Sequence, residues 1–168
     1  MQAGRLTTIA LLAAVGTALF VAESYVPMPM PFLKIGLANA SSVVALLLLG
    51  PSAMMTVTGI RIVAGSILVG SLFGPGFILS CSAGLVSALV MSAVKKLTGN
   101  LFSVIGISLI GSFVHVITQI LVVFLLYVKS PSILYLLPLL FFTAIAGGLV
   151  VGWVAGRMVG LMNTLRLH

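Results

Sequence analysis

Long apolar runs are the feature that most restricts what this chain can fold into. The runs approach or exceed the roughly 20 residues that a helix needs to cross a bilayer, and they lack the alternation typical of membrane β-strands. Of the 168 residues, 61% are hydrophobic and 5% are charged, whereas a soluble domain has about a quarter charged residues. The sequence therefore predicts an all-α integral membrane protein with a single transmembrane domain over residues 1–168.

Turn-forming residues divide the chain into about six transmembrane helices. The second predicted helix has about 14 residues, which is short for a span. It is either a tilted helix flanked by a buried loop or a partial helix. The expected helices are Thr7–Tyr25, Gly36–Gly50, Ser52–Leu72, Gly76–Val94, Ser103–Val128 and Ser132–Gly160, the last with a bend near Pro138.

Basic residues indicate how the helices are oriented. The net charge of +7 comes mostly from single Lys and Arg residues between apolar runs, which points to membrane topology rather than to nucleic-acid binding. With six helices, both termini lie on one side, together with most of the basic residues. The positive-inside rule places that side in the cytoplasm. The expected inner residues are Arg5, Lys95, Lys96, Arg157 and Arg166, and the expected outer ones are Lys34 and Lys129.

Small residues recur every four positions on the first and last helices. Such spacing lets another helix approach closely, so we expect these faces to contact partner subunits. The predicted partner-interface residues are Ala10, Ala14, Ala18, Gly148, Gly152 and Gly156.

Six polar side chains in or beside the apolar segments are predicted to lie in the outer half or at the centre of the membrane. An ionisable group within a span costs from about 3 kcal/mol upward, so it marks a function or a buried partner. We expect these side chains to converge on one outward-facing substrate pocket with a net positive charge, which suits a carboxylate or a phosphate. The predicted substrate-binding residues are Glu23, Lys34, Asn39, Arg61, His115 and Gln119.

Structural roles are the alternative for each of these residues. Arg61 would pair with Glu23, the single acid of the sequence, and Lys34 would be a solvated or snorkelling side chain. His115 and Gln119, one helical turn apart, would hydrogen-bond neighbouring helices. Asn39 would only cap the second helix.

Catalytic patterns are missing from the sequence. A single acid and no aspartate leave no carboxylate pair, no aspartate-rich magnesium–diphosphate motif and no zinc cluster. A phosphate-binding glycine–lysine loop is missing too. We therefore expect no enzymatic activity, catalytic residue, metal or cofactor. Cys81 is expected to be an inert buried thiol.

The segment KIGLAN (Lys34 to Asn39), with Arg61 after Gly59 and His115 before Gln119, gives the chain a recognisable pattern. It resembles a family of small bacterial membrane proteins labelled Gx transporter or heptaprenyl diphosphate synthase component I. The layout is also similar to the S components of energy-coupling factor (ECF) transporters. Those have six helices, an alanine-rich first helix that docks on a transmembrane coupling subunit, and an outer pocket.

This resemblance implies a substrate-binding subunit in the bacterial cytoplasmic membrane. It would take up a small anionic or amphipathic molecule, vitamin-like or isoprenoid-related, with a partner ECF-type ATPase module supplying the energy. The alternative is a non-catalytic membrane subunit of a prenyl diphosphate, quinone or redox assembly, because prenyl synthases need aspartate-rich motifs. A stand-alone facilitator is a third option.

Overall fold

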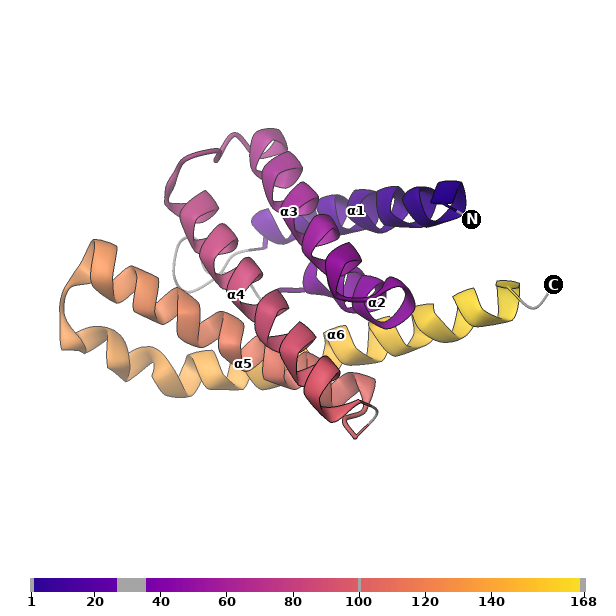
Figure 1. Ribbon diagram of the computed structural model, residues 1–168. Helices are drawn as coiled ribbons and strands as arrows, with labels where there is room; N and C mark the ends of the chain where they lie inside the picture. Colours follow the sequence, from indigo (N-terminus) through magenta and orange to yellow (C-terminus); the bar gives the residue numbers. More distant parts are fainter. Residues whose placement is uncertain (1, 27–35, 100, 167–168) are drawn as a thin grey trace.

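The computed structural model describes residues 2–26, 36–99 and 101–166, and all regular structure in these ranges is helical. A π-helical turn, Phe124–Val128, and a 3-10 helix, Pro131–Leu136, connect the last two long helices. Pro138 therefore lies in the first turn of the final helix, directly after this connection. The α-helices are α1 (Gln2–Ser24), α2 (Asn39–Leu49), α3 (Pro51–Leu68), α4 (Pro75–Thr98), α5 (Val104–Val123) and α6 (Leu137–Arg166) (Figure 1).

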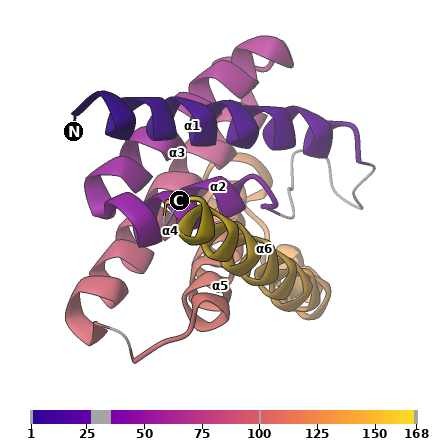
Figure 2. The same cartoon turned by 90° about the vertical axis from the view of Figure 1, so that its right-hand side faces the viewer.

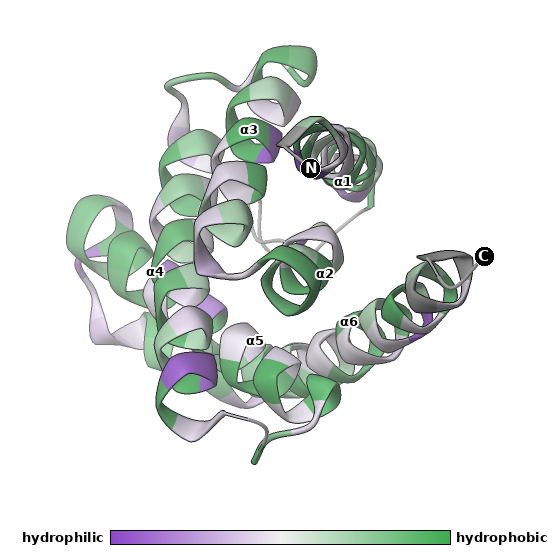
Figure 3. Ribbon diagram, turned by 45° about the vertical axis from the view of Figure 1, so that its right-hand side comes forward, coloured by the Kyte–Doolittle hydropathy of each residue, from purple (hydrophilic) through white to green (hydrophobic). Residues whose placement is uncertain are grey.

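Five segments, containing α1, α3, α4, α5 and α6, are long and apolar enough to cross a membrane. Each of these helices has exposed large apolar side chains, and Figure 3 shows green hydrophobic residues along all of them. A surface of this kind is suited to lipid. The prediction of an all-α integral membrane protein is confirmed. The expected six helices are five span-length helices and one short helix.

The short helix α2 is the core of the bundle. It packs against α1, α3 and α6, and Figure 2 shows it between α1 and α6. All residues from Asn39 to Leu46 are buried, including the polar side chains of its first turn, and the rest of the helix is apolar on every side. Its 11 residues rise about 16 Å, roughly half the hydrocarbon thickness. Of the two alternatives for this segment, the structure shows the partial helix.

The two ends of the bundle differ in their side chains. The first and last helices have their outer termini at the same end, on the right of Figure 1, which we call the terminal end. The opposite end, with the α3–α4 and α5–α6 connections, is called the loop end. Exposed aromatic residues at the loop end are Tyr25, Phe73, Tyr127 and Tyr135. Aromatic side chains of this kind are enriched at membrane–water interfaces.

Candidate functional site

A small polar cavity lies inside the bundle toward the loop end. It is lined by residues of α1, α3, α4 and α5 and by the backbone just before α2. Its volume is about 10 Å³, close to the space that one water needs. The lining residues are Phe20, Glu23, Gly36, Arg61, Ser80 and His115.

Glu23, in the last turn of α1, joins α1 to the start of α2. Its Oε1 accepts hydrogen bonds from the N–H groups of Gly36 at 2.6 Å and Leu37 at 2.7 Å. Its Oε2 accepts a third from Ala38 N–H at 3.3 Å. Backbone N–H groups at a helix start lack helical acceptors and attract negative charge. The buried carboxylate therefore provides hydrogen-bond acceptors for the backbone N–H groups that precede α2. The helix itself starts at Asn39 rather than at the expected Gly36.

Arg61, on α3, is directed toward α2. Its Nε donates to Ser42 Oγ over 3.2 Å, and its Nη2 donates to Asn39 Oδ1. Thr58 also donates to Ser42 Oγ, over 2.9 Å. Among the described residues, no hydrogen bond joins Arg61 to Glu23, although both line the same cavity. Each charge has its own hydrogen-bond partners, and the carboxylate and the guanidinium interact electrostatically across the cavity rather than through a direct hydrogen bond.

Glycines provide the space for the arginine side chain. A Cβ at Gly16 of α1 would overlap Ser41 Oγ and lie 3.0 Å from Arg61 Cδ. A Cβ at Gly84 of α4 would lie 2.8 Å from Ile62 Cδ1. A side chain at Gly16 would therefore have to displace the Ser41 hydroxyl and press on Arg61, whereas at Gly84 the added Cβ would meet the flexible end of Ile62 and lie at an ordinary contact distance, 3.8 Å, from Arg61 Nη2.

The four remaining predicted substrate-binding residues lie in four different settings. His115 is buried and lines the cavity, and Asn39 holds the guanidinium of Arg61. Gln119 lies one turn from His115 and is 1% exposed. Its Oε1 and Nε2 have no hydrogen-bond partner among the residues the structure describes. Lys34 lies outside the described residues.

Two lining residues were not predicted from the sequence. Ser80 begins a run of small residues spaced four apart on α4, which continues with Gly84, Ala88 and Ser92. This spacing normally indicates helix packing, yet the buried Oγ of Ser80 has no partner in the described part of the chain. Phe20 belongs to the apolar pattern of α1, and its ring packs directly on Gly65 of α3. Ser80 could have been considered from the sequence, because it is a polar residue among small packing residues. Nothing in the sequence distinguishes Phe20 from the other apolar residues of α1.

The predicted partner-interface residues occupy different environments. Ala10, Ala14 and Ala18 form an exposed face of α1. Gly148 and Gly152 are buried against α5 of the same chain, where a Cβ would lie 3.0 Å from Leu109 Cα and 2.7 Å from Ile105 Cα, respectively. These two glycines serve packing within the chain, whereas a Cβ at Gly156 would meet nothing within 4 Å.

Fold and site together define a multi-pass helical membrane protein whose buried polar groups meet near one end of the bundle. Within the described ranges, no group of three or more His, Cys, Asp or Glu residues is arranged to hold a metal ion. The chain belongs to the family described as heptaprenyl diphosphate synthase component I, whose family model matches residues 12–158. No curated protein and no solved structure matches the chain.

Proposed function

We propose that this chain is the substrate-binding membrane subunit of an uptake system in the bacterial cytoplasmic membrane. Its substrate is a small anionic or amphipathic molecule, vitamin-like or isoprenoid-related. The observation that carries the proposal is the polar cavity, where Glu23, Arg61, Ser80 and His115 meet from four helices. Buried charges and unpaired polar groups are costly in an apolar interior, and a ligand that uses them gives a reason for their presence.

The chemistry of the cavity suits a ligand with a carboxylate or a phosphate. The N–H groups preceding α2 already hold one carboxylate, that of Glu23. Arg61 has five N–H donors, and its Nε and Nη2 bond to Ser42 and Asn39. A ligand anion would share the remaining donors of Arg61 and take over N–H groups from Glu23.

A cavity of about 10 Å³ is too small for a vitamin-sized molecule. The structure therefore corresponds to a closed, ligand-free form in this proposal, and binding has to separate the side chains around the cavity. A ligand shifts such an equilibrium only by binding the open form more tightly than the closed one. The carboxylate that joins α1 to α2 would then link ligand binding to the position of α1.

The exposed alanine face of α1 is where we place the contact with a transmembrane coupling subunit. Ala10, Ala14 and Ala18 are exposed, and small side chains allow a second helix to approach closely. A partner ATPase module of the ECF type would supply the energy, because the sequence has no nucleotide-binding loop of the usual kind.

Two serine variants test the binding site. Ser80 Oγ and Ser66 Oγ are both buried without a hydrogen-bond partner in the described residues, but only Ser80 belongs to the lining set of the cavity. Both serine-to-alanine changes should leave the fold intact. A lost ligand hydrogen bond of about 0.5–1.5 kcal/mol should lower ligand affinity roughly 2- to 10-fold in Ser80→Ala and leave Ser66→Ala at the wild-type value.

Native mass spectrometry of gently purified protein gives the readout, namely the fraction of protein carrying a co-purifying small molecule. The molecule released from the wild type then serves as the ligand for titrating both variants. Equal affinity in all three proteins, or no bound molecule in the wild type, would count against the proposed pocket.

A second proposed function is a non-catalytic membrane subunit of a prenyl diphosphate, quinone or redox assembly, and the family description, which names a component of a prenyl diphosphate synthase, supports the first of these. In that case Ser80→Ala has no effect, and the exposed α1 face carries the function. Ala14→Leu should then release a co-purifying protein subunit. Transport by the pure chain in liposomes without ATP would instead indicate a stand-alone facilitator.

A further inference from the structure

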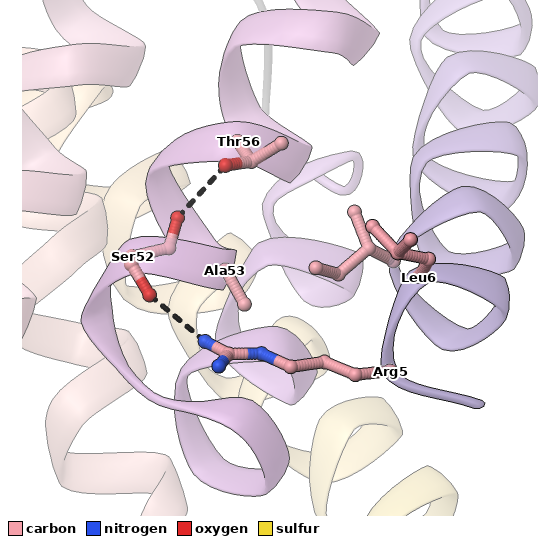
Figure 4. A pocket seen from close by; sticks show the side chains of 6 residues that line it. Arg5, Leu6, Ser52, Ala53 and Thr56 are labelled. Carbon is pink, nitrogen blue, oxygen red and sulfur yellow. Dashed lines mark hydrogen bonds between the residues drawn. The ribbon is translucent and has the colours of Figure 1, made fainter. Parts of the chain in front are cut away.

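We infer a second binding site, for one anionic phospholipid, between α1 and α3 at the terminal end. A crevice of about 320 Å³ opens there and is lined by Arg5, Leu6, Ile9, Ser52, Ala53 and Thr56 (Figure 4). Arg5 lies 18 positions before Glu23 on α1, which corresponds to about 27 Å along the helix. The crevice is therefore separate from the polar cavity, and its role does not depend on the proposed substrate.

The polar part of the crevice is suited to a phosphate group. Arg5 reaches from α1 to α3, where its Nη2 donates to Ser52 Oγ over 3.0 Å (Figure 4). Ser52 is in the first turn of α3, after Pro51, and the preceding Gly50 provides no side-chain cap. Free N–H groups and the positive end of the helix dipole occur at such a position. The guanidinium, the hydroxyl and the helix start all favour an anion.

The other walls of the crevice are apolar. Leu6 and Ile9 of α1 face Ala53 of α3. Along α3, the stripe that begins at Thr56 continues toward the loop end through exposed Ile60, Val63 and Ile67. These positions are spaced by four, three and four residues, so they lie on one helical face. The surface is polar at the terminal end and apolar farther along α3, as expected for a lipid with an anionic headgroup and acyl chains.

The positive charge around the crevice favours an anionic phospholipid over a neutral one. The one acidic side chain of the sequence, Glu23, is buried near the loop end and lies about 27 Å from Arg5 along α1, so no acidic side chain can pair with Arg5. Lys95 and Lys96 are in the last turn of α4, and Arg157 is in the second half of α6, which runs toward the same end as the N-terminus (Figure 1). Basic pockets between transmembrane helices are typical sites for anionic headgroups, and lipid surrounds this crevice in a bilayer.

The test compares lipids on the full chain purified in a neutral detergent. Phosphatidylglycerol and phosphatidylcholine with identical acyl chains are titrated, and bound lipid is counted by native mass spectrometry while thermal unfolding is followed in parallel. We expect wild-type protein to retain one phosphatidylglycerol and to unfold at a higher temperature with it. Phosphatidylcholine and inorganic phosphate should have little effect.

Arg5→Gln should weaken phosphatidylglycerol binding about tenfold, and Arg5→Lys should keep the preference for this lipid. Lys129→Gln is the matched control, because Lys129 is an exposed cation at the loop end. Arg5 is itself exposed, so its replacement leaves the core untouched. Equal binding of both lipids, equal protection by inorganic phosphate, or the same loss in Arg5→Gln and Lys129→Gln would each overturn the inference.

Discussion

A guanidinium inside an apolar bundle needs hydrogen-bond acceptors. For Arg61 these are the side-chain oxygens of Asn39 and Ser42 on α2. Removing one partner from a buried charged network typically costs about 3–5 kcal/mol. We expect Arg61→Ala to destabilise the protein by that order, because it leaves Asn39 Oδ1 unpaired and Glu23 with no cation at the cavity. Thermal unfolding in detergent measures the effect. Arg61→Lys, which keeps the charge, should lose less; equal losses would show that the charge is unimportant for stability.

Replacing Gln119 should stabilise the protein, in contrast to replacing Arg61. Its amide is 1% exposed, with neither polar atom paired in the described part of the chain. An unsatisfied buried amide costs about 1–3 kcal/mol. Gln119→Met, which has a similar volume, should therefore stabilise the ligand-free protein by about that amount in thermal unfolding. A destabilised variant would show that the amide has a partner that the described residues do not contain.

Gly65 controls the position of the Phe20 ring. A Cβ at Gly65 would overlap that ring, which is 2% exposed and lines the cavity. Overpacking of this kind costs about 1–3 kcal/mol, so Gly65→Ala should be destabilised and should bind ligand more weakly. Gly59→Ala is the control on the same helix, because nothing lies within 4 Å of its added Cβ. Similar unfolding temperatures for the two variants would contradict the close contact.

At the scale of helices, α5 and α6 are joined through glycines. A Cβ at Gly152 would lie 2.7 Å from the backbone Cα of Ile105, whereas at Gly156 it meets nothing within 4 Å. A backbone atom cannot rotate away, so Gly152→Ala should separate the helices and cost about 1–3 kcal/mol. Gly156→Ala should be neutral or slightly stabilising. Unfolding temperatures of the two variants in the same detergent make the comparison, and equal values would mean that α6 can shift without cost.

The helix pattern could be predicted from the sequence because apolar length and turn residues decide it. The third and fourth helices were expected to start at Ser52 and Gly76, and they start one residue earlier, at Pro51 and Pro75. The hydrogen bonds of Glu23 could not be predicted, because they depend on three N–H groups brought together by the turn before α2. The lining role of Ser80 was equally hidden, since a serine spaced four residues from a glycine is usually part of a packing face.

For the molecule as a whole, the uneven distribution of charge leads to a topology prediction. The terminal end carries Arg5, Lys95, Lys96 and Arg157, so the positive-inside rule places it in the cytoplasm. In a Cys81→Ser background, Ser130→Cys should react with a membrane-impermeant maleimide on intact spheroplasts. Lys96→Cys should react only after the membrane is opened. Labelling of both positions from outside, or the reverse pattern, would contradict this orientation.

The small volume of the cavity also affects how fast a substrate can bind. The cavity between Phe20, Glu23 and His115 has a volume of only about 10 Å³, so a substrate molecule can enter only after thermal motion opens the bundle. Association that needs a conformational change is slower than diffusion allows. As substrate concentration rises, the observed association rate should stop increasing and reach a plateau set by the protein, which stopped-flow binding kinetics can measure.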